Sequence, residues 1–379
     1  MKFFVPSLIF PMILMALNSH AGELGPKAAG HAVDLVPKAA LGQKLYFDFN
    51  LSEPAGQSCA SCHLPEAGFA DPDRELPVSR GIHPDRFGDR NSPTAAYAMY
   101  SPDFHFDKEE QLYVGGQFFD GRATTLEEQA KQPFVNAVEM ANPDVATVVR
   151  KVRAASYAKD FDKIFGKGSL NDEQIAFENI VSAIAEFERS PEFRPFTSKY
   201  DYYLAGKVKL SKLEKEGLQL FEAEDKGNCA ACHPSQVGPQ GQPPLFTDFT
   251  YDNLGVPKNT NSPFYTQSRQ YNAEGLDYVD LGLGKTTGRP EDKGKFKVST
   301  LRNVELTPPY LHNGIFHTLG EVVDFYNTRD TRSDWGEPEV PENVNTEELG
   351  NLGLTNHEVD AIVAFMKTLT DGYRISGGH

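Results

Sequence analysis

Two short strings constrain this chain more than any other feature. Residues 59–63 read Cys-Ala-Ser-Cys-His, and residues 229–233 read Cys-Ala-Ala-Cys-His. In a C-x-x-C-H string the two cysteines can form thioethers with the vinyl groups of one porphyrin, and the histidine can bind its iron. The pattern therefore predicts two covalently bound c-type haems. The predicted attachment residues are Cys59, Cys62, His63, Cys229, Cys232 and His233.

These four cysteines are the only ones in the 379 residues, and two other interpretations of them exist. A four-sulfur zinc site would have to join pairs that lie 170 positions apart (229 − 59), and it would leave both histidines unused. A disulfide within each pair also leaves the histidines unexplained. Haem attachment accounts for all six residues.

The first residues predict export. Met1–Lys2 is a short positive region, residues 3–17 are largely apolar, and Ser19–Ala21 offers small residues at a cleavage site. We expect residues 1–21 to be a signal peptide, with retention as a membrane anchor as the alternative. Because c-type haem is attached outside the bacterial cytoplasm, the sequence predicts a periplasmic protein without stable membrane insertion.

The charge balance narrows the choice of partners. Lys and Arg total 37 against 53 Asp and Glu, for a formal net charge of −16. Nucleic acid is not expected as a partner. A basic or neutral redox protein would be attracted over long range, although acidic charge that only keeps an exported protein soluble is equally consistent.

Hydrophobic periodicity predicts a mostly α fold. The expected helices cover residues 39–47, 124–132, 144–155, 172–188, 212–221, 318–326 and 356–370. In the helix at 172–188 we expect a buried stripe of Ile175, Ile180, Ile184 and Phe187. Each half of the chain reads as a helix, a haem motif, a long loop and a helix. This weak repeat predicts two cytochrome c-like domains, residues 22–205 and 206–379.

Two haems alone fit an electron shuttle, a peroxidase or a redox sensor. A catalyst must leave one iron position open, and a catalyst that cleaves peroxide also needs a nearby acid/base group. Gly116–Ala123 (GQFFDGRA) followed by Leu126–Ala130 (LEEQA) favours a catalyst, and so does Pro133 with residues 136–140. Three further strings are Arg90–Thr94 (RNSPT), Lys297–Asn303 (KVSTLRN) and Leu306–Gly314 (LTPPYLHNG).

With these strings the sequence resembles the bacterial di-haem cytochrome c peroxidase and MauG family over nearly all of the mature chain. The resemblance implies that the N-terminal haem, with His63 as its proximal ligand, reacts with hydrogen peroxide. Gln129, Pro133 and Glu139 match the distal pocket of the family. Glu139 would be the acid/base group, and its burial should raise its pKa. The C-terminal haem, with His233 as its proximal ligand, would transfer electrons.

The resemblance also implies a calcium ion between the two halves. Asn91, Thr307 and Pro309 match the positions around it. An amide oxygen and two backbone carbonyls are the hard oxygen ligands that calcium prefers.

Two positions depart from parts of the family. Tyr326 stands where the peroxidases carry a methionine ligand to the electron-transfer iron, and MauG-like members have tyrosine there. A phenolate stabilises ferric iron, whereas a thioether favours ferrous iron. Met366 and Met140 are the alternative ligands. Phe119 replaces the tryptophan that relatives usually place between the haems, so it would contact both cofactors.

The sequence therefore predicts an enzyme that reduces hydrogen peroxide with electrons from a protein. Tyr326 favours a MauG-like form, in which a side chain of a partner protein is the electron source. The alternatives are a conventional peroxidase that oxidises a small cytochrome c or a cupredoxin, and a non-catalytic electron-transfer or sensing cytochrome. His83 is a candidate second ligand to the N-terminal iron. Monomer and homodimer both stay open.

Overall fold

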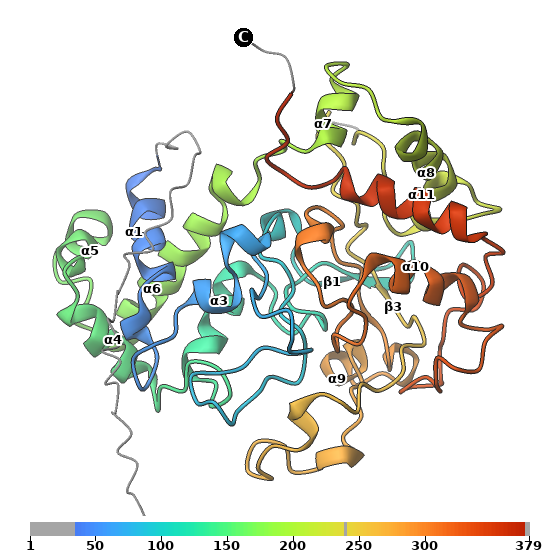
Figure 1. Ribbon diagram of the computed structural model, residues 1–379. Helices are drawn as coiled ribbons and strands as arrows, with labels where there is room; N and C mark the ends of the chain where they lie inside the picture. The colour runs from blue at the N-terminus through green and yellow to red at the C-terminus, as the bar shows by residue number, and fades with distance from the viewer. Residues whose placement is uncertain (1–34, 239–240, 376–379) are drawn as a thin grey trace, which may run out of the picture. The chain divides into compact units, whose positions relative to one another are not determined.

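The computed structural model describes residues 35–238 and 241–375, so the predicted signal peptide lies outside the described residues. Within those residues the fold is mostly helical, with a few very short strands (Figure 1). None of the helices in this part of the chain is long and apolar enough to cross a membrane.

All seven expected helices are present, with ends shifted by a few residues. They are α1 (Pro37–Tyr46), α3 (Leu126–Val135), α4 (Val145–Ala154), α6 (Glu173–Glu188), α8 (Lys212–Glu222), α10 (Leu319–Thr328) and α11 (Asn356–Lys367). Four shorter helices were not predicted. They are α2 (Cys59–Cys62), α5 (Ala158–Phe165), α7 (Lys199–Leu204) and α9 (Leu283–Thr287).

The prediction of a buried stripe on α6 is wrong for one residue. Ile180, Ile184 and Phe187 are buried, but Ile175 is 58% exposed. Five residues of α-helix rotate a side chain by about 500°, which places Ile175 about 140° away from Ile180 around the helix. Phe177, only about 60° away from Ile180, is buried instead.

The first half is built on the crossing of α1 and α6, which lie side by side in Figure 1. The helices approach so closely that a Cβ on Gly42 would lie 1.8 Å from the carbonyl oxygen of Ala183 and 2.9 Å from Cβ of Phe187. Only glycine fits there. Helices α3 and α4 pack against the same α6.

The second half repeats this crossing with α8 and α11, which also lie together in Figure 1. A Cβ on Gly217 would lie 1.8 Å from the carbonyl oxygen of Ala361 and 2.9 Å from Cβ of Phe365. Helix α10 packs on α11. The two halves thus share a helix pair with the same glycine, alanine and phenylalanine contact.

Each helix pair has its own hydrophobic core. The first core collects buried side chains from Leu41 to Phe193, and the second collects them from Tyr200 to Leu369. Burial of these apolar side chains is the main stabilising contribution to each half. Both cores lie within one compact unit of the described chain, so the division into two domains stays a prediction.

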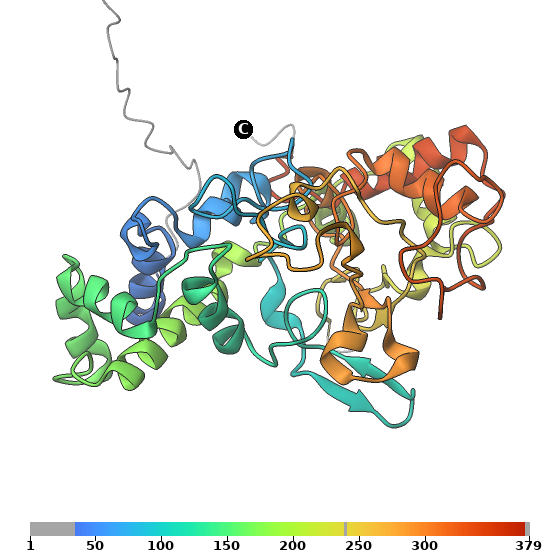
Figure 2. The same cartoon turned by 90° about the horizontal axis from the view of Figure 1, so that it is seen from below.

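The strands are two small antiparallel pairs. Strand β1 (His105–Asp107) pairs with β2 (Leu112–Val114) in the hairpin that Figure 2 shows at the lower edge of the molecule. Strand β3 (Tyr251–Asp252) pairs with β4 (Phe296–Lys297).

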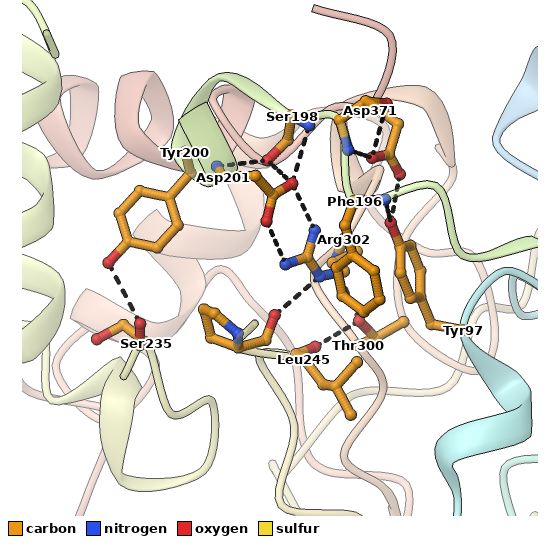
Figure 3. Close-up of polar contacts among 12 residues, drawn as sticks. Tyr97, Phe196, Ser198, Tyr200, Asp201, Ser235, Leu245, Thr300, Arg302 and Asp371 are labelled. Carbon is orange, nitrogen blue, oxygen red and sulfur yellow. Dashed lines mark hydrogen bonds and ion pairs between the residues drawn. The ribbon is translucent and has the colours of Figure 1, made fainter. Parts of the chain in front are cut away.

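A buried arginine joins the two halves (Figure 3). The guanidinium of Arg302 donates two hydrogen bonds to Asp201, at 2.8 and 3.1 Å, and a third to the carbonyl oxygen of Pro244 at 2.8 Å. Its central carbon lies 4.9 Å from the ring centre of Tyr97 and 4.4 Å from that of Phe196. Because Tyr97 belongs to the first half and Arg302 to the second, this cluster fixes the connection between them.

Candidate functional site

The first haem motif forms one wall of a cavity of about 150 Å³ in the N-terminal half. Cys59 and Cys62 are the ends of α2, and His63 follows directly. Nδ1 of His63 lies 3.1 Å from the carbonyl oxygen of Phe69. As a donor to that oxygen, Nδ1 carries the proton and leaves Nε2 with a free lone pair. Burial lowers the pKa of His63, so the ring is held in the neutral form that binds metal.

The second motif lines a separate cavity of about 210 Å³ in the C-terminal half. Here Nδ1 of His233 lies 2.7 Å from the carbonyl oxygen of Phe246. Burial lowers the pKa of His233 as well. The two motifs therefore present their histidines in the same way, each tied by one ring nitrogen to a backbone carbonyl.

In the described part of the chain all four cysteines are free thiols. Burial raises the pKa of Cys59 and of Cys229 to about 12. The pairs also line different cavities, which does not fit one shared four-sulfur zinc site. Two thiols that can attach to the vinyl groups and one neutral imidazole that can bind iron lie at each cavity, which fits a c-type haem.

The predicted distal residues come together at the first cavity. Gln129 and Pro133 lie on α3, Glu139 lies in the loop after it, and all three line the cavity with the first haem motif. The backbone N–H of Met140 donates to the carbonyl oxygen of Pro133 at 3.2 Å, which folds this loop back onto the helix. Helix α3 thus positions the whole group.

Glu139 is half-buried in the cavity wall. Burial raises the pKa of Glu139 to about 7, although the nearby charge of Arg122 acts in the opposite direction. Such a carboxyl can release and accept a proton near neutral pH. The geometry gives the group the acidity that an acid/base role requires, and the role itself stays a prediction.

The second cavity holds two of the three ligand candidates. Tyr326 on α10 and Met366 on α11 both line it, whereas Met140 lines the first cavity. Burial raises the pKa of Tyr326, so its hydroxyl keeps a proton unless a cation replaces it. His83 is absent from the residues that line the first cavity within the described chain.

Phe119 lies in the walls of both cavities. Its carbonyl oxygen accepts a hydrogen bond of 2.8 Å from the backbone N–H of Lys297 on β4. Phe119 therefore lies where the two cavities adjoin, and its contact with both cofactors stays a prediction.

Two of the three predicted calcium ligands are in direct contact. The side-chain amide of Asn91 donates to the carbonyl oxygen of Pro309 and lies 3.5 Å from that of Leu311. Thr307 lines the same cavity as Asn91 and Pro309. A rotation of the amide would place its oxygen beside the carbonyl of Pro309, which would provide two hard oxygen ligands.

Sequence reasoning missed two buried ionisable groups at the cavities. Glu188, the last residue of α6, lines the first cavity. Lys297 lines the second, donates from Nζ to the carbonyl oxygen of Gly116 at 2.6 Å, and has a pKa lowered to about 8 by burial. Lys297 opens the string Lys297–Asn303, but no sequence signal places it or Glu188 at a cavity, because both positions arise from the packing of distant segments.

Comparison with known proteins agrees with this geometry. Residues 36–209 match the model of the family described as di-haem cytochrome c peroxidase. The chain is 42% identical over 367 residues to the methylamine utilization protein MauG of Paracoccus denitrificans, covering 91% of this chain and 92% of that protein. It is 32% identical to cytochrome c551 peroxidase of Nitrosomonas europaea, covering 96% and 91%.

Solved structures agree as well. The diheme peroxidase BthA of Burkholderia thailandensis superposes with a TM-score of 0.79 at 34% identity, covering 88% of this chain and 86% of that one. A MauG-like protein associated with microbial copper homeostasis has a TM-score of 0.66 at 29% identity, covering 89% and 90%. The chain belongs to the di-haem cytochrome c peroxidase and MauG family, and it is an enzyme of that family.

Proposed function

We propose that this protein is a periplasmic peroxidase that reduces hydrogen peroxide to water at its N-terminal haem. The reaction consumes two electrons and two protons for each peroxide, and the electrons come from a protein partner. The observation that carries the proposal is Glu139, a carboxyl with a pKa raised to about 7 in the cavity of the first haem motif.

The residues fit two covalent haems. Cys59 and Cys62 would hold the first, and Cys229 and Cys232 would hold the second, with one histidine beneath each. When bound, each haem supplies an iron that changes oxidation state one electron at a time. The repeated helix crossing supports a cytochrome c-like unit in each half, with the boundary near residues 205 and 206.

The residues of the first cavity bind peroxide and move protons. Ionised Glu139 accepts a proton from one peroxide oxygen and returns it to the other, which becomes water. Gln129 can donate a hydrogen bond from its amide to a bound oxygen and so orients it. Pro133 has no backbone N–H to offer, so it fills space without competing for the proton.

The second cavity favours the MauG-like form. Tyr326 lines it on the α10 side, and a tyrosine ligand would keep the second iron oxidised. A conventional peroxidase is the second candidate, because Met366 lines the same cavity and could supply a thioether instead. The partner would be a protein modified by oxidation in the first form, and a small cytochrome c or cupredoxin in the second.

Calcium between Asn91, Thr307 and Pro309 would tie the two halves together beside the second cavity. Asn91 comes from the first half and the other two from the second. A cation there would hold the two haem sites at a fixed distance and orientation.

Peroxide consumption tests the proposal. Purified haem-loaded protein should consume peroxide with two electrons drawn from a reduced donor for each peroxide, and the Glu139→Gln protein should do so more slowly by about 10²-fold or more. If the wild-type protein passes electrons between partners but consumes no peroxide, the non-catalytic cytochrome replaces this proposal.

A further inference from the structure

Glu188 is a buried carboxyl at the first cavity that the proposed peroxide chemistry does not use. The residue is 7% exposed, and its side chain lines the cavity of the first haem motif. Its Oε2 atom is buried without a hydrogen-bond partner in the described part of the chain. A buried carboxylate oxygen without a partner costs free energy, so a protonated carboxyl is the stable form there.

Comparison of the two helix crossings shows that only the first half has a carboxyl at this position. Phe187 and Phe365 are equivalent, because each contacts the glycine of its own helix crossing at 2.9 Å. The next residue is Glu188 in the first half and Met366 in the second, and each lines the cavity of its own haem motif. One site therefore has an ionisable group where the other has a thioether.

The groups around Glu188 leave its charge uncompensated. Arg189, the nearest cation, is bound by Glu127 of α3 at 2.7 and 2.9 Å. Tyr46 of α1 and Cys59 of α2 face Glu188 and carry no positive charge. Burial raises the pKa of Glu188 to about 8, with the charge of Arg189 acting in the opposite direction.

We propose that Glu188, when it is ionised in the oxidised protein, takes up a proton as an electron reaches the N-terminal haem and releases it when that haem is oxidised again. The electron comes from the donor, the proton comes from solvent, and an O–H bond forms on the carboxylate. The added electron and proton together leave the charge of the cavity unchanged, which is the favourable outcome in a buried site. The inference rests on the haem at this cavity in the proposed function.

The test is the midpoint potential of each haem between pH 6 and pH 9.5, measured without peroxide on haem-loaded protein. For one proton per electron, the equilibrium constant of reduction changes tenfold per pH unit, which is 59 mV. We expect this slope at the N-terminal haem above pH 8, where the oxidised protein holds Glu188 mostly ionised, and its loss in Glu188→Gln. Glu188→Met, which copies the second half, should lose it too, and Glu188→Asp should keep a slope.

Glu139 faces the same cavity and titrates near pH 7, so Glu139→Gln is the matched control. It should keep the slope above pH 8. An unchanged slope in Glu188→Gln, or a flat wild-type potential above pH 8, would overturn the inference. Because no peroxide is present, this outcome is separate from a failure of peroxide reduction, and unchanged haem spectra of each variant show that it has folded.

Discussion

Replacement of Glu139 by glutamine should slow peroxide activation by about 10²-fold or more, the usual contribution of a general acid/base group. With a pKa of about 7, about half of the Glu139 carboxyls are ionised at pH 7 and about a tenth at pH 6. The wild-type activation rate should therefore rise about fivefold from pH 6 to pH 7 and about twofold more above it. The variant should be slow throughout and show no step.

The same substitution should change how the stability of the protein depends on pH. The pKa of Glu139 is raised in the folded protein from 4.5 to about 7, so the folded state binds more protons between these values. Wild-type stability should fall as the pH rises through this window, by up to about 3 kcal/mol at 1.36 kcal/mol per unit. The stability of the glutamine variant should not fall in this pH window, and denaturant unfolding at pH 5 and pH 8 would show the difference.

Stopped-flow mixing with peroxide is the assay, and Glu128→Gln is the control. Glu128 is an exposed residue of α3 that accepts a hydrogen bond from the backbone N–H of Thr124, which glutamine can also accept. Wild-type rates and pH dependence in the Glu139→Gln protein would refute the assignment of Glu139 as the acid/base group.

Three further changes test other parts of the structure. Tyr326→Phe should change the spectrum of the second haem and raise its potential, while an unchanged spectrum and potential would shift the assignment to Met366. Chelation of calcium should perturb the spectra and lower activity, and Asn91→Ala should weaken metal retention in elemental analysis; full activity in chelator with no bound metal would contradict the site. Arg302→Met leaves the Asp201 carboxylate buried without its partner and should destabilise the protein by about 3–5 kcal/mol in denaturant unfolding, whereas a loss under 1 kcal/mol would contradict this role.

The parts of the fold that follow from local pattern could be predicted from sequence. The seven longer helices carry an apolar stripe or a capping residue, as Asp172 shows by accepting the backbone N–H of Ile175 at 2.9 Å. Helix α5 has an apolar face of Phe161, Ile164 and Phe165 but is short and lacks a capping residue, because Tyr157 before it makes no capping hydrogen bond. The strands are only two or three residues long and show no alternation.

The site residues also divide into those that the sequence predicts and those that it does not. C-x-x-C-H strings identify their own chemistry, so both haem motifs could be read directly, and the family resemblance supplied Glu139. The cavity positions of Glu188 and Lys297 could not be predicted, since a Glu or Lys in a sequence by itself indicates an exposed side chain. Their burial depends on which distant segments cover them. Ile175 shows the converse, an apolar residue that the other described residues leave 58% exposed.

The most direct test of the central claim is the reaction of fully ferric, haem-loaded protein with one equivalent of hydrogen peroxide. The proposal predicts that the peroxide is consumed without prior reduction, that the haem spectra change, and that two electrons from a reduced protein donor restore the starting spectrum. A ferric protein that leaves peroxide unconsumed, and consumes it only after one haem is reduced, would contradict the MauG-like form. A protein that consumes none in either state would contradict peroxide reduction altogether.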